Sequence, residues 1–326
     1  MIDKYNREID YIRISITDRC NLRCIYCMPE EGVDLLTHEE ILSYDEIEKL
    51  CRCFVNIGIK KIKITGGEPL VRKGIDLLIG KIKAIDGIES VTLTTNGVLL
   101  KEHLPKLITA GLDGVNISLD TLDHKKYEAI VRKDAMKQVL RAVEDVLTYK
   151  EIKVKINCVP LLETAKDDII NIAGLAKNKR LSVRFIEMMP IGLGKNFSFY
   201  SEEQIVEILE QAYGKLTHKN EILGNGPAHY YSVDGFKGSI GFISAITHQF
   251  CNECNRVRLT SDGFLKTCLH YETGADLKSL LRERREDSYL EQFIRHTIYD
   301  KPMSHNFHGN QQYGTYEQEH MSRIGG

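Results

Sequence analysis

The 326-residue sequence lacks any long uninterrupted apolar segment and has almost no net charge. No stretch approaches the roughly 18 consecutive apolar residues that a membrane-spanning helix needs. The N-terminal stretch MIDKYNREIDYIR mixes charged and apolar residues, unlike the apolar core of a signal peptide. A net charge of −2 gives no overall basic bias toward nucleic acid or an anionic membrane, so any basic site is local. We expect a cytoplasmic protein that binds neither nucleic acid nor a membrane.

A disulfide framework is also not indicated, because the nine cysteines are odd in number and clustered. Clustered cysteines in a reducing compartment indicate metal binding. Two groups of three stand out. The first group is Cys20, Cys24 and Cys27, and the second is Cys251, Cys254 and Cys268.

Short runs of alternating apolar and polar residues predict six strands, with helical patterns between them. The predicted strands cover residues 11–15, 61–65, 90–94, 114–119, 152–159 and 182–187. Ser43 and Glu46 form a capping box that would start the first helix. Regular strand–helix alternation implies parallel strands with right-handed crossovers. It predicts an α/β fold, a partial (β/α)6 barrel of the TIM type, with an open doubly wound sheet as the alternative.

The pattern changes after residue 200, where one more helix is followed by Gly-rich strand-like pieces near residues 230–243. The second cysteine group, a charged helix and a polar tail come next. We therefore expect a barrel domain over residues 1–215 and a C-terminal α+β subdomain with the second cysteine group over residues 216–326.

In each predicted strand, every second residue is apolar and the residues between them are polar, so the strand has one apolar and one polar parity. Because side chains alternate between the two faces of a strand, and helices cover the apolar face, the polar parity would face the barrel interior. It carries Arg13, Ser15, Lys61, Lys63, Thr65, Thr92, Thr94, Asn116, Ser118, Lys153, Lys155 and Arg184. A closed eight-stranded barrel fills its interior with branched apolar side chains. A polar interior predicts a wet cavity whose cations require an anion, although a solvent-exposed sheet face would show the same alternation.

The first cysteine group has C-x3-C-x2-C spacing and directly follows the first predicted strand. A structural zinc site takes four protein ligands, and a ferredoxin-type [4Fe–4S] cluster takes four cysteines. Three thiolates on a [4Fe–4S] cluster would leave one iron open to a small chelating ligand. The alternative is a zinc site that a distant histidine completes.

This spacing, with Tyr26 before the last cysteine, resembles the signature of the radical S-adenosylmethionine superfamily. A Gly66-Gly67-Glu68-Pro69 motif after the second predicted strand is similar to that family too. The resemblance implies that the open iron chelates the methionine group of S-adenosylmethionine. It also implies that an electron from the cluster cleaves the sulfonium to give a 5′-deoxyadenosyl radical. The glycines would let backbone carbonyls approach the ligand closely.

The second cysteine group also lacks a fourth cysteine, and His248 and His270 flank it, so a Cys3His zinc site is one interpretation. Arg256 and Arg258 share one strand parity between Cys254 and Cys268. Two arginines beside a metal centre favour an anionic or purine ligand.

Over essentially the whole chain, these features resemble the GTP 3′,8-cyclases, the molybdenum cofactor biosynthesis protein A family. The matching segments are SITDRCNLRCIYCMP, ITGGEPL, LTTNG, NISLD, RFIEMM and the terminal Gly325-Gly326. The resemblance implies abstraction of the C3′ hydrogen of GTP and attack of the resulting radical on guanine C8, giving 3′,8-cyclo-7,8-dihydro-GTP. This is the first step of molybdenum cofactor biosynthesis.

The same resemblance implies two [4Fe–4S] clusters, the second of which guanine would ligate. It implies an electron donor such as flavodoxin or ferredoxin, and a downstream partner, cyclic pyranopterin monophosphate synthase. Two alternatives stay open at this point. One is a radical peptide maturase with an auxiliary cluster, and the other is a non-catalytic zinc-binding protein.

The resemblance also implies roles for individual residues. S-adenosylmethionine would contact Tyr26, Gly66, Gly67, Glu68, Ser118 and Met189. GTP would contact Arg13, Lys61, Lys63, Thr94, Lys155, Arg184, Arg256, Val257 and Arg258. The catalytic set would be Arg256, Arg258 and the tail residues Gly325 and Gly326, which would reach the active site. Family members commonly have arginine at the position of Lys63, and lysine lacks the bidentate geometry of arginine.

Overall fold

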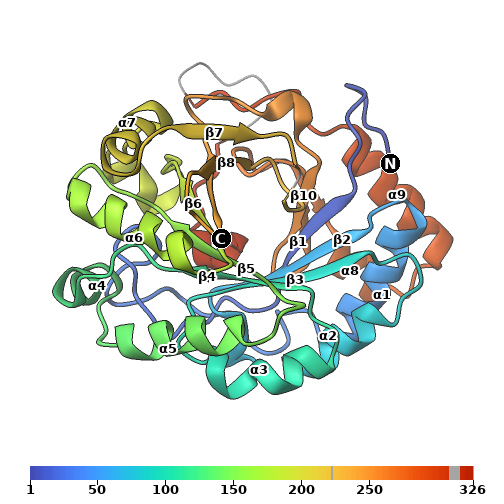
Figure 1. Cartoon of the computed structure of the whole chain (residues 1–326). Helices are drawn as coiled ribbons and strands as arrows, with labels where there is room; N and C mark the ends of the chain where they lie inside the picture. Colours follow the sequence, from blue (N-terminus) through green and yellow to red (C-terminus); the bar gives the residue numbers. More distant parts are fainter. Residues whose placement is uncertain (222, 308–315, 326) are drawn as a thin grey trace.

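The computed structural model describes residues 1–221, 223–307 and 316–325. Its centre is a curved twelve-stranded sheet with helices on the outer side (Figure 1). The order of the strands in this sheet is β12-β11-β10-β1-β2-β3-β4-β5-β6-β9-β8-β7. The curvature encloses a space toward which the last described residues of the chain extend (Figure 1).

The six predicted strands form the middle of this sheet. They are β1 (Tyr11–Ser15), β2 (Lys61–Thr65), β3 (Ser90–Thr95), β4 (Gly114–Ser118), β5 (Lys153–Cys158) and β6 (Ser182–Ile186). Consecutive strands pair in parallel and in chain order. Their ends differ from the predicted ends by one residue at most. The predicted partial barrel is therefore confirmed.

Helices on the outer side of the sheet cover the apolar parity of these strands. They include α1 (Tyr44–Asn56), α2 (Ile75–Lys83), α3 (Leu100–Thr109), α4 (His124–Val131), α5 (Met136–Leu147), α6 (Lys166–Asn178) and α7 (Glu202–Tyr213). The register aligns Ile12 with Ile62 and Ile62 with Val91, and all three are fully buried. Burial of such side chains contributes about 1.5–3 kcal/mol each. The apolar parity thus faces the helices, and the polar parity is left for the interior.

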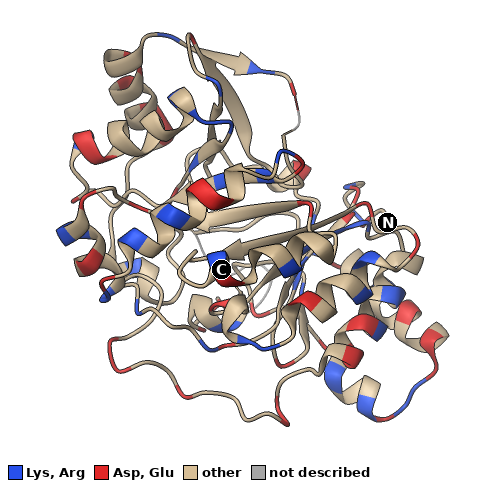
Figure 2. Ribbon diagram, turned by 60° about the horizontal axis from the view of Figure 1, so that its bottom comes forward, with Lys and Arg blue, Asp and Glu red and all other residues tan. Residues whose placement is uncertain are grey.

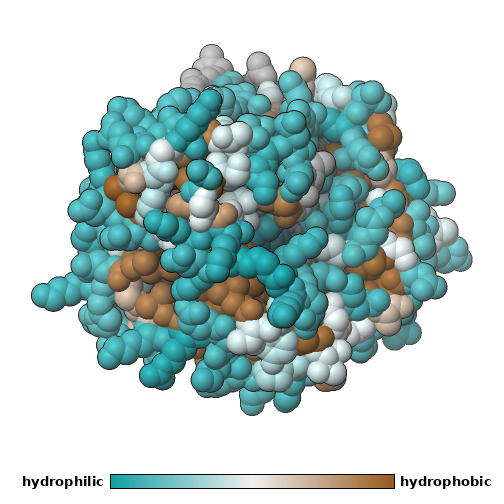
Figure 3. All heavy atoms as spheres, in the orientation of Figure 1, coloured by the Kyte–Doolittle hydropathy of each residue, from teal (hydrophilic) through white to brown (hydrophobic). Residues whose placement is uncertain are grey.

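Local sequence signals position the helices. At the start of α1, the Glu46 backbone N–H donates to Ser43 Oγ at 3.1 Å, and the Ser43 N–H donates to the Glu46 carboxylate at 2.7 Å. This is the predicted capping box, which satisfies two backbone donors that the helix itself cannot pair. Figure 2 shows charges of both signs over the outer helices, consistent with the small net charge. The face in Figure 3 is mostly hydrophilic, with hydrophobic residues in separate patches.

The C-terminal region adds three strands to each edge of the barrel sheet. On the β6 side these are β9 (Ser239–Ile243), β8 (His229–Val233) and β7 (Leu216–Lys219). On the β1 side they are β10 (Arg256–Leu259), β11 (Phe264–Lys266) and β12 (Gly274–Asp276). β9 and β10 pair in parallel with β6 and β1. The predicted boundary at residue 215 falls within one continuous sheet and stays a prediction.

Three further helices belong to this region: α8 (Leu277–Arg282), α9 (Asp287–Tyr299) and the short α10 (Met321–Ile324). Helix α9 packs on α1 and α8. No helix in the described part of the chain is long and apolar enough to cross a bilayer.

Candidate active site

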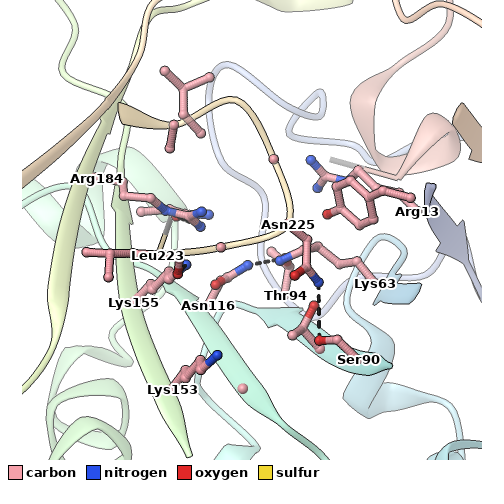
Figure 4. A pocket seen from close by; sticks show the side chains of 18 of the residues that line it. Arg13, Lys63, Ser90, Thr94, Asn116, Lys153, Lys155, Arg184, Leu223 and Asn225 are labelled. Atoms are coloured by element: carbon pink, nitrogen blue, oxygen red, sulfur yellow. Dashed lines mark hydrogen bonds between the residues drawn. The ribbon is translucent and has the colours of Figure 1, made fainter. Parts of the chain in front are cut away.

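A polar cavity lies inside the curve of the sheet, where the strand parity predicts it. Six cationic side chains line it, namely Arg13, Lys63, Lys153, Lys155, Arg184 and Arg256. Figure 4 shows Arg13, Lys63, Lys155 and Arg184 converging on this space from different strands. Thr94 and Asn116 add neutral polar groups, and Asn116 Nδ2 lies 3.4 Å from Thr94 Oγ1.

Several cations of this cavity are poorly solvated and repel one another. Burial, reinforced by Arg184 and Arg13, holds the pKa of Lys63 well below its usual value. Burial and then Arg184 lower the pKa of Lys155 to about 7. Of the described residues that line the cavity, only Asp113 is acidic, and it forms an ion pair with Lys83 at 2.9 Å. A bound polyanion would relieve this repulsion, so the cavity suits a triphosphate.

Residues 223–228, which were not predicted as part of the site, also line the cavity. The Lys155 ammonium donates a hydrogen bond to the Leu223 carbonyl. Asn225 Nδ2 donates to Ser90 Oγ at 3.2 Å, a bond drawn in Figure 4. Asn255 Nδ2 donates to the Asn225 carbonyl at 3.0 Å. The Gly-rich run at residues 224–227 was the available sequence signal, but its partners are distant in the chain.

Three predicted GTP contacts, Lys61, Val257 and Arg258, do not line the cavity. Lys61 Nζ lies 2.6 Å from the carboxylate of Asp10, which neutralises its charge. Val257 is opposite Ile12 in the sheet register and is buried in the hydrophobic core. Its side chain therefore faces the helices, and only its backbone is left for contact with a ligand.

The first cysteine group lies on the loop after β1. The Cys27 and Met28 N–H groups donate to the Cys24 carbonyl at 2.9 and 3.0 Å, which makes a compact turn. Arg23 donates to the Cys20 carbonyl at 2.9 Å. Burial raises the pKa of Cys27 to about 12 and that of Cys24 well above its usual value. Such thiols ionise only beside a strong positive charge, so this set fits ligation of a metal centre.

The zinc alternative requires a tighter arrangement. With Zn–S distances of about 2.3 Å, sulfurs around one tetrahedral zinc ion lie roughly 3.8 Å apart. Within the described residues, no three His, Cys, Asp or Glu side chains are arranged around a single ion.

The Gly-Gly-Glu-Pro loop packs directly against the residues that precede Cys20. A Cβ at Gly66 would lie 2.6 Å from the Thr17 carbonyl oxygen, and one at Gly67 would lie 2.5 Å from the Arg19 carbonyl oxygen. The Gly67 N–H donates to the Thr17 carbonyl at 2.7 Å. Here the glycines allow two backbone segments to approach each other, in addition to the expected approach of a ligand.

Glu68 is buried and makes hydrogen bonds within the protein. Its carboxylate accepts from the Leu70 N–H at 3.0 Å, the Thr95 hydroxyl at 2.8 Å and the Asn96 N–H at 2.7 Å. Burial raises its pKa to about 7 despite these bonds. Asn96 Nδ2 in turn donates to Asn21 Oδ1 at 2.7 Å, beside Cys20. Glu68 thus links the loops after β2 and β3 to the cysteine loop.

The other predicted S-adenosylmethionine contacts lie at or beyond the carboxyl ends of strands. Ser118 ends β4, and Met189 follows β6. The Tyr26 hydroxyl donates to Asp120 Oδ2 at 2.6 Å, and Asp120 Oδ1 accepts from the Val159 N–H at 2.8 Å. Burial raises the pKa of Asp120 to about 6. Asp120 was not predicted as a site residue, although it ends the NISLD segment.

The second cysteine group has a cationic surrounding. Cys251 lies on the short helix η3 (Cys251–Glu253), Cys254 directly follows it, and Cys268 follows β11. Although burial opposes ionisation, Lys301 and Arg256 lower the pKa of Cys254 to about 6. Lys301 is itself buried and donates to the Thr267 carbonyl. A thiolate is favoured here even before a metal binds.

Arg7 is the second unpredicted residue of this centre. Its guanidinium donates to the Cys251, Pro302 and Met303 carbonyls, each at 2.8 Å. Asp3 pairs with it at 2.6 Å. Arg7 therefore connects the N-terminus to the backbone of Cys251 and to the segment that carries Lys301.

The two histidines that could complete a zinc site have other surroundings. His248 Nε2 lies 3.2 Å from Glu203. His270 packs against the rings of Tyr271 and Phe307, with centroids 4.4 and 4.3 Å away. Burial lowers its pKa to about 4, so it is neutral at physiological pH.

The last described residue of the C-terminal tail, Gly325, contacts Arg258 on β10. Arg258 is buried and donates to the Gly325 carbonyl. Gly325 has a φ of +84°, and a Cβ there would lie 2.9 Å from Ser15 Cβ and 3.0 Å from Thr65 Cγ2. Only glycine fits this conformation and space without strain. Gly326 lies outside the described residues.

Comparison with known proteins assigns the class first. A family model described as the radical SAM superfamily matches residues 14–176, and one described as Molybdenum Cofactor Synthesis C matches residues 181–307. SuiB of Streptococcus suis, solved with bound S-adenosylmethionine, aligns with a TM-score of 0.60 and 16% identity. The alignment covers 92% of this chain and 66% of that longer chain, and it shows the fold alone. The barrel and the first cysteine group thus define a radical S-adenosylmethionine enzyme.

Close relatives narrow the assignment. The GTP 3′,8-cyclase of Clostridium perfringens (strain SM101 / Type A) is 46% identical over 307 residues, 94% of this chain and 95% of the relative. The GTP 3′,8-cyclase of Syntrophomonas wolfei is 44% identical over the whole length of both proteins. The chain belongs to the GTP 3′,8-cyclase family, which confirms the resemblance found in the sequence.

Proposed function

We propose that this enzyme converts GTP to 3′,8-cyclo-7,8-dihydro-GTP, the first step of molybdenum cofactor biosynthesis. The observation that carries the proposal is the cavity inside the curve of the sheet, which six cationic side chains line. Membership of the cyclase family supports the same reaction. A peptide maturase, the alternative within the radical class, gives no reason for six cations around one cavity.

The cavity side chains would bind and orient GTP. Arg13, Lys63, Lys155 and Arg184 offer charges to the triphosphate from four strands of the sheet, with Thr94 as a neutral donor beside them. Placement on strands of one rigid sheet fixes the substrate relative to the reacting carbon, which is worth several kcal/mol of barrier. Arg256 and Arg258 approach from β10, on the side of the second cysteine group.

The first cysteine group would hold a [4Fe–4S] cluster with one iron left open. A cluster bound there would supply one-electron reduction of S-adenosylmethionine, the chemistry needed to remove the C3′ hydrogen of GTP. The chain's own part is to position the cofactor through the Gly66-Gly67 loop, Tyr26, Ser118 and Met189. Glu68 and Asp120 act through these groups, because their carboxylates are occupied by protein hydrogen bonds.

We assign a second [4Fe–4S] cluster to Cys251, Cys254 and Cys268, with a position left for guanine. Lys301 and Arg256 favour the anionic charge of a thiolate-bound centre, which supports this assignment. The proposed electron donor is a small redox protein such as flavodoxin or ferredoxin, and cyclic pyranopterin monophosphate synthase would use the product. All nine cysteines are unpaired, which suits the reducing cytoplasm.

The test is anaerobic reconstitution of the full chain, followed by iron analysis and turnover. We expect about eight irons per chain for two [4Fe–4S] clusters. With dithionite, S-adenosylmethionine and GTP, the enzyme should form 5′-deoxyadenosine and the cyclised nucleotide. Stoichiometric zinc without iron would refute the proposal.

A double variant separates the cyclase from the maturase. Arg256→Ala with Arg258→Ala should weaken GTP binding at least tenfold, because two cations near the purine end are lost. Arg285→Ala, an exposed position, is the matched control. Unchanged GTP binding in the double variant would remove the nucleotide assignment.

A further inference from the structure

One buried ion pair lies outside the machinery described above. Lys266 on β11 and Glu317 at the beginning of the last described segment are in direct contact, with side chains 4% and 2% exposed. Lys266 Nζ also donates to the Tyr271 carbonyl at 3.0 Å. The Glu317 carboxylate also accepts from the Glu319 N–H at 2.8 Å. Each charged group therefore has a second hydrogen-bond partner within the protein.

Desolvation makes such a pair a weak source of stability. Replacing a buried ion pair with apolar residues of similar size is often neutral or stabilising. Such a pair can, however, define one specific arrangement of the segments that it joins. The pair is thus better explained by what it positions than by what it stabilises.

The place of Lys266 in the sheet links this ion pair to the C-terminal tail. Lys266 is the direct neighbour of Arg258 across the antiparallel β10–β11 pair. Arg258 donates to the Gly325 carbonyl, and Lys266 binds Glu317. Two adjacent cations of one hairpin therefore hold the two ends of the same tail segment, residues 317–325.

Between these two points the tail passes the first cysteine group. Ser322 and Ile324 are each 2% exposed, and the backbone N–H of Ser322 lies close enough to the Cys27 thiol to lower its pKa against the larger effect of burial. The tail also packs closely on the segment after β6, because a Cβ at Gly192 would lie 3.2 Å from the Glu319 carbonyl oxygen. A shift at Glu317 would move every one of these contacts.

We propose that Lys266 and Glu317 are positioning residues that set the register of the C-terminal tail, and so place Gly325 beside Arg258. The inference rests on the proposed cyclase function. Neither residue lines the cavity or belongs to either cysteine group. Loss of the pair should therefore uncouple the reaction and leave both metal centres intact.

The first test is Glu317→Gln in the full, reconstituted enzyme. Iron content and cleavage of S-adenosylmethionine should stay near the wild-type level. The yield of cyclised GTP per 5′-deoxyadenosine should fall at least tenfold, and amide hydrogens of residues 321–325 should exchange at least tenfold faster. Glu319→Gln is the matched control, because its pair with Arg323 is half-exposed, and it should change neither readout.

Conservative variants separate charge from shape. Lys266→Arg should keep most of the coupling, whereas Lys266→Met should lose it as Glu317→Gln does. If Glu317→Gln fails to fold, Glu317→Asp keeps the charge and is measured in the same way, with a smaller loss of coupling expected.

Wild-type coupling together with wild-type amide exchange in Glu317→Gln would overturn the inference. Loss of iron from that variant would also overturn it, because the pair would then serve the second cysteine group. A wild-type enzyme that does not cyclise GTP would refute the proposed function instead. Amide exchange would then still show whether the Lys266–Glu317 pair holds the tail.

Discussion

Lys155 gives the most quantitative test of the cavity, because its protonation must change when an anion binds. In the empty cavity its pKa is lowered to about 7, from an ordinary value of 10.5, by burial and then by Arg184. Its present hydrogen-bond acceptor is a neutral carbonyl, that of Leu223. A triphosphate would bring negative charge and raise this pKa again. GTP binding should therefore take up a proton whenever the pH exceeds about 7.

The size of the effect follows from the pKa. At pH 8 a group with a pKa of about 7 is only about one-tenth protonated, so binding should take up about 0.9 protons at Lys155. At pH 6 the uptake should be only about 0.1 protons. By linkage, the contribution of Lys155 to the affinity should weaken about tenfold for each pH unit above 7. A phosphate with a second pKa near 6 is already ionised in this range, so it does not mask the trend.

Calorimetry can count these protons. GTP is titrated into the anaerobic enzyme, without S-adenosylmethionine, in buffers of different ionisation enthalpy at pH 6 and pH 8. Lys155→Arg keeps a positive charge that does not titrate in this range. It should take up about 0.9 fewer protons than the wild type at pH 8 and nearly the same number at pH 6. Lys150→Arg, an exposed position, is the matched control.

One result would refute this reasoning. If Lys155→Arg and the wild type take up equal numbers of protons at pH 8, Lys155 is either charged in the empty cavity or not in contact with the nucleotide. Lys63, whose pKa is also lowered by burial, is present in both proteins, and Lys155→Arg keeps a positive neighbour beside it.

Three other changes test the two cysteine groups and the Gly66-Gly67-Glu68-Pro69 loop. Cys20→Ser should abolish 5′-deoxyadenosine formation, since an iron loses its thiolate; cleavage that persists would exclude this cysteine group from the mechanism. Gly67→Ala should weaken S-adenosylmethionine binding at least tenfold in equilibrium dialysis, because its Cβ would lie 2.5 Å from a carbonyl oxygen. Gly80→Ala, with no atom within 4 Å of the added Cβ, should bind as the wild type does. Arg7→Met should reduce the iron content to about four per chain and leave cleavage of S-adenosylmethionine intact. The control Arg180→Met should keep about eight irons per chain. Equal iron contents in the two variants would contradict the role of Arg7.

The middle of the fold could be predicted because its signals are local. A strand with period-two alternation, such as β1, reports its own boundaries and its buried face. The capping box at Ser43 likewise defines the start of α1 from residues that are adjacent in the chain. The edges of the sheet could not be predicted in this way. β9 and β10 pair with β6 and β1 across long sequence separations, and no local pattern specifies such partners.

The same distinction holds within the site. Strand parity alone predicts that Arg13, Lys63 and Lys155 face the cavity, and all three line it. Parity also gives the means to reject Val257, because a residue between two inward-facing arginines faces outward. Lys61 shares the inward parity, yet the side chain of Asp10 from the chain before β1 neutralises it.

Arg7 and Lys301 illustrate the limit of sequence reasoning most clearly, because neither has a motif. Arg7 acts on the second cysteine group from the other end of the chain through a backbone carbonyl, and Lys301 acts on it through charge. A buried cation with carbonyl partners has no sequence signature of its own, since every residue offers a carbonyl. In the proposed function, such residues set the charge and the backbone position around the three thiols that would hold the second cluster. Their identification depends on the fold, and their variants test the centre without removing any of its ligands.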